Sequence, residues 1–517
     1  MSQSSPQTSA GRRSGGRAAR LRARAAPLSR DLRPVRPGMT GGTYRPLSDA
    51  EVQRIHTAAL DALEIIGLAD APASGVEIMT AAGVVQGADG RLRFPRAVVE
   101  DMLAGAAKEI TLHGRDARHD MRIGGQRVYY GTAGAAVHLV DLETGAYRDS
   151  SVQDLHDAAR IAENLDNIHF FQRPMVARDV SDNFEMYINT LYACCSGTTK
   201  HVGTSFSDPA YVAGALDLLH LIAGGEARWR DRPFVSASNC FVVPPMKFAT
   251  ESCISMEACI RAGMPVLMLS AGQAGATAPA PIAGAVVQAV AECLAGFVYA
   301  NAIRRGCPVI FGTWPFVSDL RTGAMSGGSG EQALLTAACA QMMQFYGLPG
   351  GAPAGMADSK LPDMQAGWEQ ATSAVMAGLA GLNMIYEAAG MHASLLGFCH
   401  ESLILGDDLL GQAQRCVRGI EVNDETTGLE VMKQVCLGGP GHYLGADQTL
   451  DLMQSEYIYP TLGNRSSPKE WEEEGRPDLL ENATARKKAL LARPANARFD
   501  AVLDAEIRAR FAIHLPR

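Results

Sequence analysis

PVLMLSAGQAG, at residues 265–275, is followed by PVIFGTW at residues 308–314, and these two runs decide the fold class. Each begins with proline, continues through β-branched and other apolar residues, and then reaches glycine, serine or threonine. Such a continuous apolar run is typical of a strand buried on both faces, as in a parallel sheet. The long apolar segment between them predicts a helix, so the pair predicts a strand–helix–strand unit.

Similar runs recur on both sides at about 30–45-residue spacing. They are VYYGTAG (128–134), IHFFQRP (168–174), HVGTSF (201–206), FVSASNCFVV (234–243), GAPAGMADSK (351–360) and NMIYEAAGMHAS (383–394). Eight such units predict an α/β fold, a closed (β/α)8 (TIM) barrel. An open doubly wound sheet is the next choice, but its GxGxxG signature is missing, as is a GxxxxGK[ST] phosphate loop.

The ends of the chain differ from this central part in charge. Residues 1–38 hold nine arginines and one aspartate, a net charge of +8, whereas the whole chain carries −8, so the remainder carries −16. The polar stretch 1–46 lacks apolar periodicity and is predicted to be a disordered basic tail. The acidic remainder argues against a nucleic-acid partner.

Three further segments are expected. Residues 47–125 predict an N-terminal helical and β-hairpin region, in which Ser48 and Glu51 make a capping box before the first helix. A second helix is expected at 94–107 and short strands at 109–112 and 120–123. Residues 126–435 then form the barrel, and 436–517 a helical C-terminal extension that packs on it.

Cysteine usage and hydropathy bear on the compartment. The eleven cysteines include no CxxC pair, and no secretory apolar segment is present. The most apolar stretch, 281–300, contains Gln288 and Glu292 and is predicted to be a buried helix, with no membrane partner. Reduced thiols indicate a cytoplasmic protein.

In a barrel of this class the active site lies at the carboxyl ends of the strands. HExxH, zinc-ligand spacing and the GxSxG nucleophile motif are all missing, so no metal site is predicted. Because lone histidines from different strands can converge, a different barrel enzyme, such as a metal-dependent lyase or hydrolase, stays open.

Aromatic residues on or just beyond the predicted strands are the first candidates for substrate binding. Aromatic faces suit a methylated ammonium ion, which carries charge but few or no N–H groups. Trp314 stands out because it follows Gly312 at a strand end, although any aromatic residue there can also be core filling. The candidates are Tyr129, Tyr130, Phe206, Trp314, Phe316 and Tyr386.

Three polar residues complete the predicted substrate site. Glu387 directly follows the eighth strand and would face an ammonium ion or a barrel arginine, since a buried acid needs a cation or a hydrogen bond. Arg321 or His392 could hold a substrate carboxylate. Arg321 could equally belong to an ion pair within its loop.

The segment AGMADSKLPDMQAGWEQ, 354–370, resembles the trimethylamine methyltransferase family of corrinoid-dependent methylamine methyltransferases. Its pyrrolysine-containing members carry a glycine pair, pyrrolysine, a small residue, Asp-Ser-Lys and a Pro-Asp-x-Gln-Ala stretch. The resemblance extends over about residues 45–490 and includes GGPGHYLG (438–445) and the Trp471 region. Met356 stands at the pyrrolysine position, and the matching residues are Asp358, Ser359, Lys360, Pro362, Asp363, Gln365 and Ala366.

The resemblance implies a homo-oligomeric (β/α)8 barrel that moves a methyl group from a small methylated amine to the cobalt(I) corrinoid of a separate corrinoid-binding protein. No tightly bound cofactor is then expected. Met356, Asp358 and Lys360 become the candidates nearest the chemistry. Methionine lacks the electrophilic imine of pyrrolysine, which favours the non-pyrrolysine branch and a quaternary amine such as glycine betaine. Trimethylamine or another methylamine as donor, or a non-catalytic protein that binds quaternary ammonium ions, are the alternatives.

Overall fold

The computed structural model describes residues 28–132 and 134–516. They fall into two compact units. One comprises Pro37–Gly419 and Pro460–Arg517, and the other comprises Ile420–Tyr459 with the N-terminal residues up to Arg36. The first unit holds all the parallel strands and every residue discussed below as part of a site.

Eight strands run parallel, and each predicted run contains one of them. Five pair in the order β9-β10-β11-β14-β16, and β6, β19 and β18 pair in a second sheet. Isolated parallel bridges join Gly131 to Phe170 and Phe311 to Gly350, next to β6 and β9 and next to β16 and β18. The two sheets are thus linked by single bridges beside their end strands. The eight strands are β6 (Arg127–Tyr130), β9 (Phe171–Gln172), β10 (Val202–Thr204), β11 (Val235–Asn239), β14 (Val266–Ser270), β16 (Val309–Thr313), β18 (Gly351–Pro353) and β19 (Met384–Tyr386).

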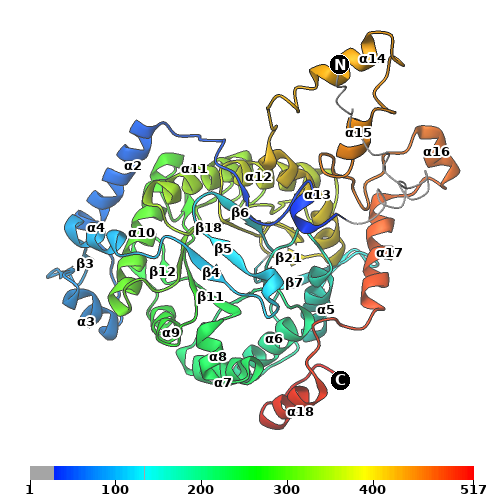
Figure 1. The fold of residues 1–517 in the computed structure, drawn as a ribbon. Helices are drawn as coiled ribbons and strands as arrows, with labels where there is room; N and C mark the ends of the chain where they lie inside the picture. The colour runs from blue at the N-terminus through cyan, green and yellow to red at the C-terminus, as the bar shows by residue number, and fades with distance from the viewer. Residues whose placement is uncertain (1–27, 133, 517) are drawn as a thin grey trace, which may run out of the picture. The chain divides into compact units, whose positions relative to one another are not determined.

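The helices that connect these strands surround them (Figure 1). All five residues of β14 and of β16 are buried, as their unbroken apolar sequence requires. The connecting helices are α5 (Val152–Glu163), α6 (Asn183–Gly197), α7 (Val212–Ala223), α8 (Glu226–Asp231), α9 (Thr250–Arg261), α10 (Ile282–Ile303), α11 (Gly330–Tyr346), α12 (Met364–Leu379) and α13 (His400–Arg418). The predicted α/β class with alternating strands and helices is confirmed.

Helix α10 is the one helix within the described residues that is long and apolar enough to cross a membrane. In its most apolar window, 78% of the residues are buried inside the protein. The carboxyl group of Glu292 within it accepts hydrogen bonds from the Met246 N–H, at 2.7 Å, and from the hydroxyl group of Ser270. Its surroundings are those of a core helix.

The N-terminal region covers the amino ends of the strands. Strands β4 (Ile110–Leu112) and β5 (Met121–Ile123) form a hairpin, and Nη1 of Arg127, at the start of β6, pairs with Glu109 at 2.9 Å. Nδ1 of His201, just before β10, lies 2.8 Å from the carbonyl oxygen of His113. Because the hairpin covers this end, the opposite end is left for a site. The other elements of this region are α2 (Asp49–Asp61), the π-helical turn Ala62–Ile66, α3 (Ala73–Ala81), α4 (Arg96–Ala104) and the hairpin β2 (Val85–Gln86) with β3 (Leu92–Arg93).

Short strands are added near the carboxyl ends. The segments that follow β6 and β19 combine into a four-stranded sheet in the order β20-β21-β7-β8. Two short pairs, β12 with β13 and β15 with β17, follow β11, β14 and β16. The bounds are β7 (His138–Asp141), β8 (Ala146–Asp149), β12 (Val242–Val243), β13 (Lys247–Phe248), β15 (Gln273–Ala274), β17 (Phe316–Val317), β20 (Met391–His392) and β21 (Gly397–Phe398).

The segment boundaries differ from the predicted ones. Residues 1–27 of the expected tail lie outside the described residues. Within the described part of the expected tail, Arg30–Leu32 form a 3₁₀ turn and β1 (Met39–Thr40) pairs antiparallel with β6. The first segment of the first unit ends at Gly419, before the predicted barrel end at 435, and its second segment begins at Pro460. Between these points lie α14 (Leu429–Cys436) and α15 (Asp447–Leu452).

The C-terminal extension contains α16 (Pro468–Glu473), α17 (Leu479–Leu491) and α18 (Ala501–Arg510). Helix α17 packs against α5 and α13, where Lys487 pairs with Glu401. All eleven cysteines are free.

Candidate functional site

Glu387 is the buried acid at the carboxyl end of β19. It is 1% exposed and adopts a left-handed backbone conformation with φ of 62°, which is strained for a residue with a side chain. Its Oε2 accepts a hydrogen bond from the Gly134 N–H at 2.8 Å, and no ion pair to it occurs in the described part of the chain. Burial raises the pKa of this carboxyl group to about 8.

Gln172 brings a second polar side chain to Glu387. A Cβ atom at Gly134 would lie 3.1 Å from Oε1 of Glu387 and 3.4 Å from Cγ of Gln172, so both side chains approach the same glycine. The Gln172 amide donates to the Ser238 hydroxyl on β11 at 3.1 Å. The loop after β6 thus lies against side chains from β9 and from the end of β19, and a side chain at position 134 would press on the Glu387 carboxyl group.

An aromatic cluster includes Tyr386, the residue before Glu387. The Tyr386 ring lies 5.0 Å from that of Phe170 and 5.3 Å from that of Trp314, and Phe316 meets Trp314 edge-on at 6.4 Å. Trp314 Nε1 donates to the Gly351 carbonyl oxygen at 3.1 Å, which fixes the indole ring. Three predicted cage residues, Trp314, Phe316 and Tyr386, are therefore brought together, and Tyr386 is the chain neighbour of Glu387.

The motif at 354–370 forms the loop between β18 and α12. Met356 is fully buried, and a Cβ atom at Gly327 would lie 3.2 Å from its side chain, so the loop around Gly327 covers it. Asp358 accepts hydrogen bonds from Ser326 Oγ at 2.6 Å, from the Gly327 N–H at 2.8 Å and from Ser394 Oγ at 2.6 Å. Asp358 therefore fastens the loops after β16 and β19 to the motif.

Other predicted residues lie elsewhere. Tyr129 Oη donates to Arg122 in the amino-end hairpin, and Tyr130 Oη donates to Ala374 on α12. Phe206 packs against Tyr187 of α6, with ring centroids 5.9 Å apart.

The three polar candidates outside the cluster have local partners. The Arg321 side chain is 88% exposed and pairs with Asp319 at 2.7 Å. Lys360 is exposed and donates to the Asp358 carbonyl oxygen at 2.8 Å. His392 is buried with Nε2 2.6 Å from Ser402 Oγ, and burial lowers its pKa to about 4, so it is neutral. The structure does not bring these side chains to Glu387.

Two polar residues that the sequence reasoning did not single out, Gln172 and Arg173, stand at the end of β9. Both lie inside the run IHFFQRP, where polar side chains interrupt a buried strand at its carboxyl end. That interruption is the signal that could have found them. Within the described residues no three His, Cys, Asp or Glu side chains gather as metal ligands would.

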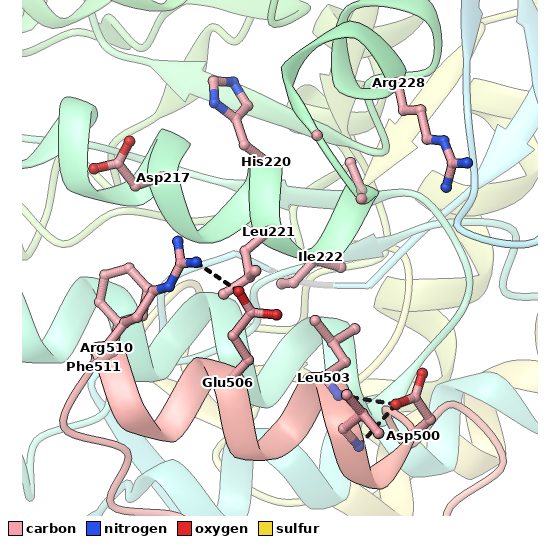
Figure 2. Close-up of a pocket in the computed structure, with 14 residues that line it drawn as sticks. Asp217, His220, Leu221, Ile222, Arg228, Asp500, Leu503, Glu506, Arg510 and Phe511 are labelled. Carbon is pink, nitrogen blue, oxygen red and sulfur yellow. Dashed lines mark hydrogen bonds and ion pairs between the residues drawn. The ribbon is translucent and has the colours of Figure 1, made fainter.

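A separate pocket of about 1120 Å³ lies between α7 and α18 (Figure 2). Its acidic groups on α18 have structural partners: Glu506 pairs with Arg510 at 2.6 Å, and Asp500 caps the helix through the N–H groups of Val502 and Leu503. We assign no chemistry to this pocket.

The family model described as Trimethylamine methyltransferase (MTTB) matches residues 13–513. The chain belongs to the trimethylamine methyltransferase family. It is therefore a methyltransferase, as the motif at 354–370 predicted.

The alignments with three named relatives extend over most of this chain. It is 30% identical over 437 residues to trimethylamine methyltransferase MttB of Desulfitobacterium hafniense (strain DSM 10664 / DCB-2), covering 84% of this chain and 87% of that protein. It is 29% identical over 469 residues to the glycine betaine methyltransferase of Desulfitobacterium hafniense (strain Y51), covering 90% and 96%. Trimethylamine methyltransferase MttB of Methanosarcina thermophila is 29% identical over 457 residues, covering 87% and 93%.

Similar solved structures include two dihydropteroate synthases. That of Xanthomonas albilineans matches with a TM-score of 0.35 and 11% identity, covering 60% of this chain and 99% of the other. That of Vibrio fischeri ES114 matches with a TM-score of 0.36 and 11% identity, covering 60% and 100%.

Proposed function

We propose that the eight parallel strands close into a (β/α)8 barrel and that the protein demethylates a quaternary amine, of the glycine betaine class, at their carboxyl ends. The methyl group passes to the cobalt(I) corrinoid of a separate protein. The single observation that carries this proposal is the buried carboxyl group of Glu387, which has no ion pair in the described part of the chain and directly follows Tyr386, whose ring packs against Trp314.

Charge complementarity supports a cationic ligand. A buried carboxyl group without an ion pair stays protonated until a cation approaches, because burial disfavours its charged form. A quaternary ammonium ion placed against Glu387 would let the carboxyl group ionise, and the faces of Trp314 and Tyr386 would add cation–π attraction. A buried acid that follows an aromatic cluster along the chain therefore fits a donor that carries a permanent positive charge.

The chemistry of such a donor asks little of the protein. When the C–N bond breaks, its electron pair stays on nitrogen and yields a neutral tertiary amine, so no general acid has to protonate the leaving group. The new bond uses the electron pair of the cobalt(I) nucleophile, which becomes methylcobalt(III). The protein's part is to desolvate the ammonium ion and to aim one methyl group outward. Met356, buried under Gly327, supports a mechanism without an electrophilic side chain.

Exposed apolar side chains within the motif support a protein partner. Met364 is 81% exposed and Trp368 57% exposed on the first turns of α12, the helix that follows β18 in the chain. Large apolar groups exposed together commonly mark interaction sites. We infer that the corrinoid protein docks here, where its cofactor would face the strand ends.

The test is a methyl-transfer assay. Enzyme, the reduced corrinoid protein and glycine betaine are mixed, and the cobalt(I) absorbance is followed while dimethylglycine is quantified. We expect methylcobalt and dimethylglycine in equal amounts, and a loss of at least about tenfold in rate for Glu387→Gln. Methyl transfer from trimethylamine but from no betaine, carnitine or choline would contradict the proposed donor class. Ligand binding without transfer would contradict the proposed activity.

A further inference from the structure

Arg173 is a buried guanidinium group that lacks an acidic partner. It follows β9 directly and is 7% exposed. Its backbone is fixed on both sides: the N–H donates to the Gly203 carbonyl oxygen at 2.9 Å, and its carbonyl oxygen accepts from the Ala135 N–H at 3.0 Å. The backbone that carries the side chain is therefore held by hydrogen bonds at the strand ends and does not belong to a mobile loop.

One polar atom of this side chain is buried and unused. Nη2 donates to Ser205 Oγ at 2.9 Å, whereas Nε is buried without a hydrogen-bond partner. No aspartate or glutamate in the described part of the chain lies within ion-pair distance of it. An arginine keeps its charge in proteins, so a buried one without a counter-ion is costly.

Arg115 shows how this protein treats a partly buried arginine. Its Nη1 donates to the carbonyl oxygens of Cys195 and Ala497, and its guanidinium group lies over the ring of Phe499, 4.6 Å from the centroid. Arg148, which is less buried, makes a two-pronged contact with Asp154 at 2.7 Å. Arg173 has neither kind of compensation, and this difference points to an external anion.

Arg173 is tied to the proposed cation site through one short segment. The Gly134 N–H donates to Glu387, and the next N–H, of Ala135, donates to the Arg173 carbonyl oxygen. Gln172, the chain neighbour of Arg173, approaches Gly134 as Glu387 does. In the described part of the chain, an acid without an ion pair and a guanidinium group without an acidic partner thus follow β19 and β9, the strands on either side of β6.

We propose that Arg173, with Ser205 beside it, binds the carboxylate of a zwitterionic quaternary amine and so selects betaines over donors that lack a carboxylate. This inference rests on the proposed function. The planar guanidinium group offers Nε and an Nη in the fork geometry that matches a carboxylate. Arg173 takes the anchoring role that the sequence suggested for Arg321 or His392.

The test compares two ligands on the full-length protein without the corrinoid partner. Binding of glycine betaine and of choline is measured by calorimetry for the wild type, Arg173→Gln and Arg173→Lys. We expect Arg173→Gln to weaken glycine betaine binding by at least about tenfold and to leave choline binding within about twofold. Arg173→Lys keeps the charge but loses the fork, so an intermediate affinity is expected. Arg178→Gln, an exposed residue paired with Asp149 at 2.7 Å, is the matched control and should bind both ligands as the wild type does.

The outcomes separate this inference from the proposed function. A wild type that binds glycine betaine while Arg173→Gln binds it equally well, or loses both ligands equally, overturns the role of Arg173 alone. A wild type that binds neither ligand contradicts the proposed function. Thermal unfolding without ligand gives a further readout: Arg173→Met removes an unpaired buried charge and should keep or raise the Tm. A large fall in Tm would show that the guanidinium group stabilises the fold and would overturn the inference.

Discussion

Oε2 of Glu387 lies 2.8 Å from the backbone nitrogen of Gly134, which donates the one hydrogen bond that this buried carboxyl group receives in the described structure. The two residues follow β19 and β6, which are parallel neighbours. A single neutral donor does not compensate for the burial of a negative charge. The carboxyl group is therefore protonated near neutral pH and prepared to ionise when a cation binds.

The pH dependence of stability should report this protonated acid. Because its folded pKa of about 8 lies above the ordinary value of 4.5, unfolding releases a proton between these pH values, and the unfolding free energy falls as pH rises through that window. A tenfold change in a proton dissociation constant corresponds to about 1.4 kcal/mol. As pH rises from 5 to 8.5, we expect the Tm of the wild type to fall relative to that of Glu387→Gln. Parallel Tm curves for the two proteins would contradict the raised pKa.

Trp314 should contribute through its aromatic face. Trp314→Phe keeps a ring next to Tyr386 and should hold donor affinity within a few-fold. Trp314→Leu removes the aromatic face and should weaken quaternary amine binding by about tenfold or more, since cation–π attraction amounts to roughly 2 kcal/mol in a desolvated site. Calorimetric titration of both variants with glycine betaine checks this, with circular dichroism as the folding control. Equal affinities would show that Trp314 only fills the core.

Asp358 and Lys360 make a matched pair within one motif. Asp358→Ala removes the acceptor of three hydrogen bonds and leaves the donors at Ser326, Gly327 and Ser394 without it, so a loss of about 2–4 kcal/mol of stability is expected. Lys360→Ala should change stability by less than about 0.5 kcal/mol, because its side chain is exposed. Urea denaturation compares them. A Lys360→Ala variant as unstable as Asp358→Ala would contradict this division of roles.

The exposed surface of Met364 and Trp368 should affect the reaction with the corrinoid protein and not the binding of the amine. Met364→Asp combined with Trp368→Asp places charge on the proposed docking face, and we expect KM for the corrinoid protein to rise by at least about tenfold. Binding of glycine betaine without the corrinoid protein is the control and should stay unchanged. Unaltered methyl transfer at limiting corrinoid protein would show that the partner docks elsewhere.

Sequence patterns predicted the strands well because a strand buried on both faces must be almost wholly apolar, as β14 and β16 are. They also placed Trp314, Tyr386 and Glu387, since each stands where a strand ends. Side-chain direction was harder. Tyr129 and Tyr130 are neighbours whose hydroxyl groups donate to Arg122 and to Ala374 on different sides of β6, and composition does not reveal which side a residue takes.

Charge pairing was not readable from the sequence either. Arg321 has Asp319 two residues away in an exposed turn, and the two side chains form an ion pair with each other. Arg173 has no such neighbour, and only the fold shows that its guanidinium group is buried. The pairing of β1 with β6 joins residues almost ninety positions apart, which no local pattern contains.

The most direct test of the central claim is the number of protons released when glycine betaine binds, measured by calorimetry at pH 7 in buffers of different ionisation enthalpy. With a pKa of about 8, Glu387 is mostly protonated before binding and ionised afterwards. We predict release of nearly one proton per ligand by the wild type and none by Glu387→Gln. Binding of glycine betaine by the wild type with no proton release would contradict a donor cation held against Glu387.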